Sequence, residues 1–95
     1  MSSVRGLKKD IRVITEQVMI DALELGYSLK KEEDKKQVLD IIIELSEKHN
    51  DLLSRVNHPD GKENSKLVRE HFKSIIDDLL AACNKAYEKL GKLAA

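Results

Sequence analysis

Apolar side chains recur every three or four residues along three long segments of this 95-residue chain, and this spacing restricts the fold more than any other feature. Such spacing places the side chains on one face of an α-helix, whereas a β-strand requires strict alternation. The segments span about residues 3–25, 29–56 and 64–93. The predicted apolar faces are Val4, Leu7, Ile11, Ile14, Val18, Ala22 and Leu25 on the first helix, Val38, Ile42, Leu45, His49, Leu52 and Val56 on the second, and Val68, Phe72, Ile75, Leu79, Ala82, Ala86, Leu90 and Leu93 on the third.

The segments between these helices are short, so consecutive helices are expected to run antiparallel. Gly26 is expected to close the first helix in a left-handed conformation, and Asp60 or Asn64 to cap the third. The predicted fold is an all-α, antiparallel up-down-up three-helix bundle that forms one domain over residues 1–95. A chain this short buries a small core, so we expect homo-oligomerisation to complete it.

Composition restricts the partner classes. The 17 basic residues balance the 17 acidic ones, and aromatic residues make up only 3% of the chain. Neither a basic surface for nucleic acid or membrane nor a set of base-stacking rings is therefore expected. The longest apolar run is Ile41-Ile42-Ile43, and the first ten residues lack the apolar stretch of a signal peptide. With a single cysteine, Cys83, among apolar neighbours, the predicted location is the reducing cytoplasm.

A second apolar strip lies on nearly the opposite side of the first predicted helix. It consists of Val13, Ile20, Leu23 and Tyr27. Weaker strips are predicted on the second helix and on the third, namely Leu39 and Ile43, and Ile76, Leu80, Cys83 and Tyr87. Two neighbouring helices cover only part of a helix circumference, so the surplus apolar surface predicts either a wider intramolecular core or self-association. The sequence thus predicts a homodimer interface centred near Ile20 and Leu23.

The tripeptide His58-Pro59-Asp60 joins the second and third predicted helices. Together with Phe72 and the segment KAYEKLG at residues 85–91, it resembles the J-domain co-chaperones. The resemblance implies that His58, Pro59 and Asp60 contact an ATP-driven heat-shock chaperone and stimulate its ATPase. The same residues are also typical of a plain turn, because proline fixes φ, Asp-Gly favours turns and Asp60 can cap a helix.

His49 and His71 lie the same number of residues before and after Asp60, so an antiparallel hairpin brings them to similar heights. Two imidazoles at one level can begin a metal site, although neither histidine has a carboxylate partner at helical spacing. The alternative is that His49 is a buried, neutral core residue.

No convincing catalytic set is present, because a narrow bundle offers little concavity for a titratable pair. The adjacent Asp77 and Asp78 are expected on a solvated face, and Cys83 in the core. The sequence therefore predicts a non-enzymatic interaction or structural module without a cofactor. Its expected partner is a second copy of itself, with another helical protein as the further candidate. The co-chaperone and metal-binding hypotheses remain as alternatives.

Overall fold

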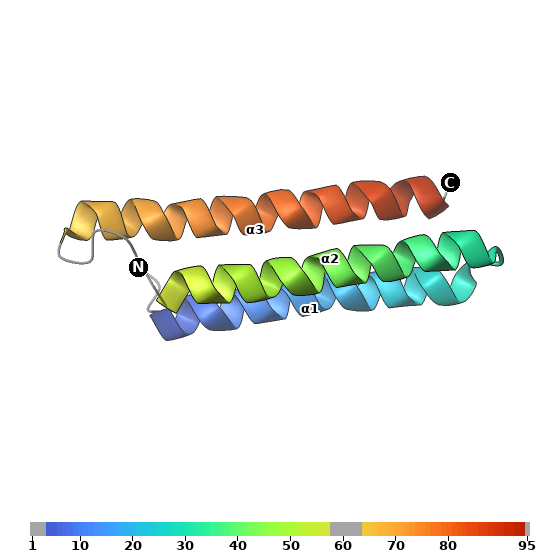
Figure 1. The fold of residues 1–95 in the computed structure, drawn as a ribbon, viewed down its shortest axis with the longest axis horizontal. Helices are drawn as coiled ribbons and strands as arrows, with labels where there is room; N and C mark the ends of the chain where they lie inside the picture. Colours follow the sequence, from blue (N-terminus) through green and yellow to red (C-terminus); the bar gives the residue numbers. More distant parts are fainter. Residues whose placement is uncertain (1–3, 58–63, 95) are drawn as a thin grey trace.

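The computed structural model describes residues 4–57 and 64–94, and it places nearly all of them in three helices. Helix α1 spans Val4–Ser28, α2 spans Glu32–Asn57 and α3 spans Ser65–Ala94. No strand occurs over these described ranges, which confirms the predicted all-helical fold. The helices lie side by side along the long axis of a body measuring 53 × 18 × 18 Å (Figure 1). In Figure 1 the colours that follow the sequence run from left to right along α1 and α3 and from right to left along α2.

The helix ends follow local chemistry, with one exception. Asn64 caps α3, because its Oδ1 accepts hydrogen bonds from the backbone amides of Lys66 and Leu67 at 3.0 and 3.3 Å. Gly26 does not close α1, since the helix continues to Ser28 and the φ angle of Gly26 is not left-handed. A β-carbon at Gly26 would lie 3.4 Å from Cγ1 of Val38, so this glycine instead allows close packing of α1 on α2.

One stripe from each helix forms the core. The buried apolar residues are Leu7, Ile11, Val18 and Ala22 on α1, Val38, Ile41, Leu45, Leu52 and Val56 on α2, and Ile75, Leu79, Cys83, Ala86 and Leu90 on α3. Burying a large aliphatic side chain of this kind contributes about 1.5–3 kcal/mol. The core therefore runs the length of the bundle and leaves the opposite side of each helix to solvent.

Three positions of the predicted apolar faces are wrong by one residue. Ile14 is exposed and its neighbour Thr15 is buried, with Oγ1 donating a 2.6 Å hydrogen bond to the carbonyl of Ile11. On α2, Ile41 is buried, whereas Ile42 is only partly buried at the edge of the core. On α3, Cys83 is buried whereas Ala82 is only partly buried, and Val4 at the start of α1 is exposed. Adjacent residues point about 100° apart, so the direction of the neighbouring helices decides which of the two faces inward.

Two further expectations about core residues need correction. His49 is partly exposed rather than buried, because the core stripe of α2 passes through Leu45 and Leu52 and leaves His49 on its flank. Its Nδ1 atom lies 3.2 Å from Oδ1 of Asn50. Cys83 is buried, which confirms its place in the core and excludes it from the outer apolar strip of α3.

Within the part of the chain that the structure describes, no helix combines the length and apolarity needed to cross a lipid bilayer.

Candidate functional site: the outer face of α1

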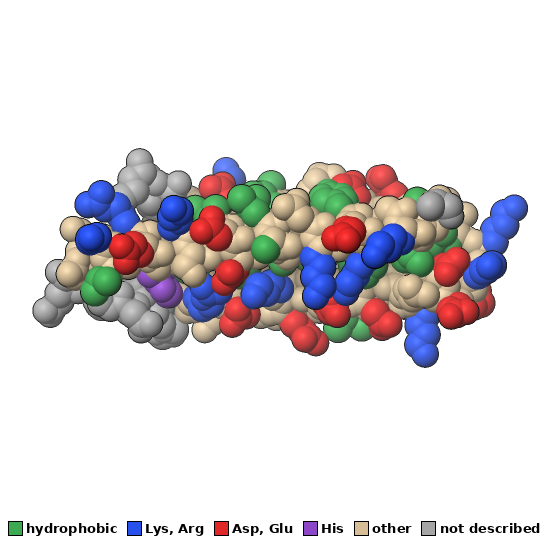
Figure 2. All heavy atoms as spheres, turned by 90° about the horizontal axis from the view of Figure 1, so that it is seen from above, with side chains coloured by type: hydrophobic (Ala, Val, Ile, Leu, Met, Phe, Trp, Pro, Cys, Tyr) green, Lys and Arg blue, Asp and Glu red, His purple; other side chains and the backbone are tan. Residues whose placement is uncertain are grey.

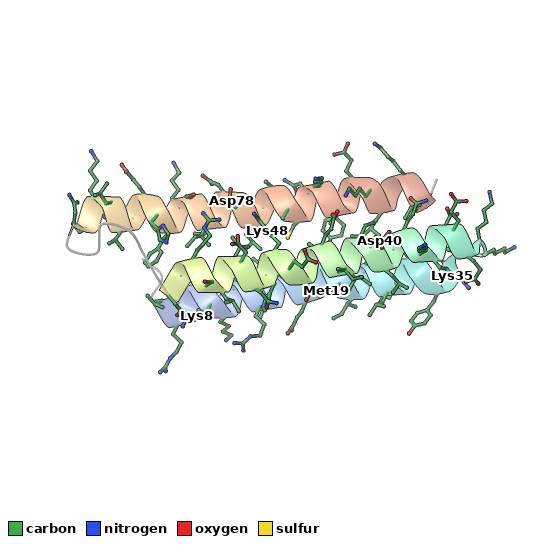
Figure 3. The ribbon with its side chains drawn as sticks, viewed as in Figure 1. Lys8, Met19, Lys35, Asp40, Lys48 and Asp78 are labelled. Atoms are coloured by element: carbon green, nitrogen blue, oxygen red, sulfur yellow. The ribbon has the colours of Figure 1, made fainter. Side chains whose placement is uncertain are left out.

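The four residues predicted to form an interface are all exposed on α1. Val13 is 53% exposed, Ile20 48%, Leu23 44% and Tyr27 87%. At 100° per residue they lie across the helix from the buried Ile11. We call these four residues the outer face of α1. Figure 3 shows side chains of α1 that project away from α3.

Apolar side chains of α2 continue this surface near one end of the bundle. A β-carbon added at Gly26 of α1 would contact Val38 of α2, so their sequence neighbours Tyr27 and Leu39 lie at similar levels of the bundle. Leu39 and, one turn further along α2, Ile43 are both more than half exposed. Exposed apolar side chains near this end of the bundle are therefore not confined to α1.

Helix α3 borders α1 on another side and is tied to it by a polar contact. The hydroxyl of Tyr87 donates a hydrogen bond to Oδ2 of Asp21. This bond, followed by desolvation and the negative charge of Asp21, raises the pKa of Tyr87 from 10.0 to about 12. Ile76 and Leu80 on α3 are also exposed. Figure 2, which views the molecule from the α3 side, shows such hydrophobic side chains among interspersed acidic and basic ones.

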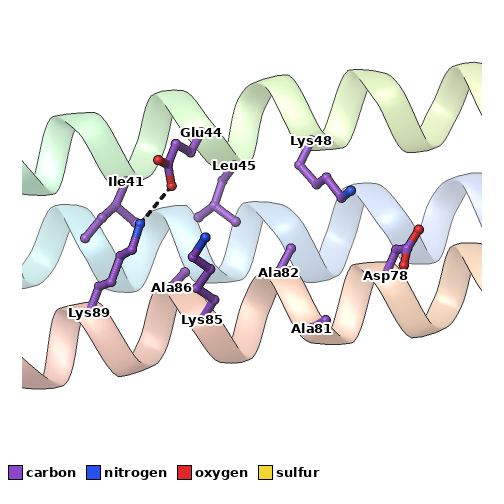
Figure 4. Close-up of a pocket in the computed structure, with 10 residues that line it drawn as sticks. All are labelled: Ile41, Glu44, Leu45, Lys48, Asp78, Ala81, Ala82, Lys85, Ala86 and Lys89. Atoms are coloured by element: carbon purple, nitrogen blue, oxygen red, sulfur yellow. Dashed lines mark hydrogen bonds and ion pairs between the residues drawn. The ribbon is translucent and has the colours of Figure 1, made fainter.

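The surface between α2 and α3 differs in character from the outer face of α1. It contains a groove of about 330 Å³ with an apolar base that includes Ile41, Leu45 and Ala86 (Figure 4). Charged side chains form its rims, and Nζ of Lys89 lies 3.1 Å from Oε2 of Glu44 across it. Small alanine side chains on α3 create the hollow, and Lys89 of α3 pairs with Glu44 of α2 across it.

Arg55 links α2 to α3 at one end of this groove, where its partner Asp78 is a lining residue. Its Nη1 donates to Oδ2 of Asp78 at 2.6 Å, and its Nη2 donates to Oγ of Ser74 at 3.1 Å. The hydrogen bond from Arg55 holds the pKa of Asp78 below its usual value of 3.8, with a further contribution from the charge of Lys48. Lys48 and Asp78 lie at the same level of the bundle (Figure 3). Asp78, expected on a solvated face, is thus part of a link between two helices.

The two histidines of the metal hypothesis have separate partners. Nε2 of His71 donates a 2.7 Å hydrogen bond to the carbonyl of Arg55, in the last turn of α2. Carbonyls of the last turn lack a partner within their own helix, so His71 acts as a cap supplied by α3. His49 instead contacts Asn50. Over residues 4–57 and 64–94, no group of three or more His, Cys, Asp or Glu side chains is placed to hold a metal ion.

Two other sequence candidates lie outside any described site. His58, Pro59 and Asp60 fall outside the described residues, so the co-chaperone hypothesis stays a prediction from the sequence. Cys83 is buried, and desolvation raises the pKa of its thiol. A raised pKa lowers the thiolate fraction, which is the nucleophilic form of cysteine.

Sequence reasoning missed the link made by Arg55. Acidic Asp51 stands four residues before Arg55, and this spacing predicts only a pair within α2. The stronger contact, with Asp78, joins two helices and depends on their relative register. The groove between α2 and α3 had a weak signal, namely the small residues Ala81, Ala82 and Ala86 on one side of α3.

Comparison with known proteins adds no relative. No family model matches the chain, and neither a curated protein nor a solved structure shows significant similarity to it.

Proposed function

We propose that this chain is a non-enzymatic helical module that self-associates as a homodimer through the outer face of α1. In this proposal an antiparallel up-down-up bundle forms each subunit, and a second copy completes it. The main observation that supports this proposal is the exposure of four apolar side chains on one side of α1, namely Val13, Ile20, Leu23 and Tyr27. Isolated exposed apolar residues are normal on a protein surface, but four on one helical strip favour a partner.

Surface energetics support a partner of the same kind. Each Å² of apolar surface removed from water contributes roughly 25 cal/mol. A two-fold dimer buries the same strip on both copies and is the commonest symmetric assembly. It also enlarges the apolar interior of a chain that is only 18 Å across in its two short dimensions.

The proposal includes a cytoplasmic location and no nucleic-acid or membrane partner. The equal numbers of acidic and basic residues give no net basic surface. The buried thiol of Cys83 is suited to a reducing compartment.

The test is the solution mass of the wild type and of Ile20→Glu by light scattering coupled to size exclusion. We expect the wild type at twice the chain mass of 10.8 kDa and Ile20→Glu at the monomer mass. Leu67→Glu on α3 is the matched control, because Leu67 is 47% exposed and Ile20 48%. The control should remain dimeric. A monomeric wild type would overturn the proposal, and a dimer that tolerates Ile20→Glu would place the interface elsewhere.

A further inference from the structure

The charges of α1 are sorted by half. Residues 4–14 carry four basic side chains and one acidic one, namely Arg5, Lys8, Lys9, Arg12 and Asp10. Residues 15–28 carry three acidic side chains and no basic one, namely Glu16, Asp21 and Glu24. The helix therefore has a positive first half and a negative second half, although the whole chain is neutral.

This order opposes the dipole of the helix itself. The amino end of a helix carries partial positive charge and favours acidic side chains, and the carboxyl end favours basic ones. The first turn of α1 has no acidic residue and its last turn no basic residue. Helix α2 has the favourable order, with Glu32, Glu33 and Asp34 in its first turn and Arg55 in its last. The charge order of α1 therefore does not stabilise α1 as a helix.

The charges of α1 also have no ion-pair partners among residues 4–57 and 64–94. Among the described residues, every ion pair lies within or between α2 and α3, and none includes a side chain of α1. Asp21 is held by hydrogen bonds from Gln17 and Tyr87 rather than by a cation. Arg5, Lys9, Arg12, Glu16 and Glu24 are all exposed beside or near the outer face of α1.

We propose that α1 pairs antiparallel with α1 of a second copy, with the positive half of each helix lying against the negative half of the other. This inference rests on the proposed self-association and adds its orientation. A two-fold axis across α1 produces the attractive contact twice. It also sets the two helix dipoles side by side in opposite directions, which is favourable. A parallel pair would instead place like charges together along its whole length.

The length of α1 makes this discrimination effective. Its 25 residues span about 37 Å at 1.5 Å per residue, so the two halves are centred nearly 20 Å apart. Exposed charges are screened beyond about 8 Å at physiological ionic strength. Each half therefore responds to the half that lies opposite, and charges at the other end cannot compensate for a wrong orientation.

The first experiment reverses the positive half with Arg5→Glu, Lys9→Glu and Arg12→Glu together. We expect the dissociation constant, measured by sedimentation equilibrium, to rise about tenfold or more, since several exposed pairs turn repulsive at once. The matched control is Lys66→Glu, Arg69→Glu and Lys73→Glu on α3, which changes the net charge equally at exposed positions outside the ion pairs. The control should change the constant about threefold or less.

The second experiment determines orientation. Adding Glu16→Lys and Glu24→Lys to the first triple variant exchanges the signs of the two halves. In an antiparallel pair this variant recovers self-association but mixes poorly with the wild type, because each half then meets its own sign. In a parallel pair it prefers the wild type. Native mass spectrometry of an equimolar mixture with isotope-labelled wild type reports the fraction of mixed dimer.

The outcomes separate this inference from the proposed function. A mixed dimer above the statistical half would overturn the antiparallel orientation. A dimer that Ile20→Glu dissociates but the triple reversal leaves intact would also overturn it, while the proposed self-association stands. A monomeric wild type removes both. Circular dichroism of every variant checks that the helices are retained, and acidic residues near the amino end of α1 should favour them.

Discussion

Helices α1 and α2 are nearly equal in length and share one core, yet their outer surfaces are organised in different ways. Each contributes one buried stripe, which includes the fully buried Ile11 on α1 and Leu52 on α2. The charges of α2 follow its dipole, and Glu44 and Arg55 pair with side chains of α3. The charges of α1 oppose its dipole and form no ion pair with any described residue.

The difference indicates where each helix finds its stabilising partners. In α2, the charges at the helix ends, the buried stripe and the ion pairs with α3 all favour the same fold. This agreement is expected of a helix whose stabilising partners lie in its own chain. In α1, only the buried stripe favours this fold, whereas the order of the exposed charges does not. A conflict between a local rule and the observed structure is expected at functional positions. This is why we assign the outer face of α1 to a second copy.

The largest expected effects concern the buried stripes, which α1 and α2 both contribute to the core. Ile11→Ala and Leu52→Ala each remove a fully buried side chain and should cost about 2–5 kcal/mol of unfolding free energy. Urea denaturation followed by circular dichroism measures both, with Ile20→Glu as the background so that association does not contribute. A cost for Ile11→Ala far below that for Leu52→Ala would show that α1 is also incomplete on its inner side.

The fold could be predicted from the sequence because the spacing of apolar residues is a property of each helix alone. Three helices were expected, and the described helices begin and end within three residues of the predicted positions. Gly26 was misassigned because a glycine near a helix end is typical of both a cap and a close contact. Val38, which distinguishes the two, lies on another helix.

The outer face of α1 could be named from the sequence because its four residues share one helical side. The contacts between helices could not be. The hydrogen bond from His71 to the carbonyl of Arg55 requires the register of α3 against α2, and the pair of Tyr87 with Asp21 joins residues far apart in the chain. The burial of Thr15 also depends on which side of α1 faces the neighbouring helices. Its hydroxyl tolerates burial because it donates to the carbonyl of Ile11 in the same helix.

A second test removes an ion pair with α3, which α2 has and for which α1 has no described counterpart. Arg55→Ala loses hydrogen bonds to Asp78 and Ser74 and should cost about 1 kcal/mol, a modest value because solvent screens the partly exposed pair. The lowered pKa of Asp78 adds a pH dependence. A carboxyl group with a depressed folded pKa stabilises the fold above its unfolded value of 3.8, and this contribution is lost as pH falls through the folded pKa.

Acid unfolding of wild type and Asp78→Asn checks this sign. The wild type should lose more stability than Asp78→Asn between about pH 5 and the acid limit of the fold. Equal losses in the two proteins would mean that Arg55 and Asp78 do not interact in solution. The charge contrast between α1 and α2 would then be smaller than the structure indicates.

A third test compares the same position at the start of both helices. Arg5 is the second residue of α1 and Glu33 the second residue of α2. In the Ile20→Glu background, Arg5→Glu should stabilise the monomer by about 0.3–1 kcal/mol, and Glu33→Lys should destabilise it by a similar amount. Thermal unfolding at low salt reports the opposite signs. If both substitutions changed the stability in the same direction, the helix dipole would not explain the difference in charge order between α1 and α2.

The smallest effect concerns the one described polar side-chain bond that ties α1 to α3. The neutral hydroxyl of Tyr87 donates to Asp21, which raises the pKa of Tyr87 to about 12. Because the folded pKa lies above the unfolded value of 10.0, the stabilisation is complete below about pH 10 and is lost as pH rises towards 12. In a Tyr27→Phe variant the phenolate absorbance comes from Tyr87 alone, since the chain has two tyrosines. Asp21→Asn in that variant should move the titration down towards pH 10. If it does not, Asp21 is free of Tyr87 in solution, and all three acidic side chains in the second half of α1 are then available to the positive half of a second copy.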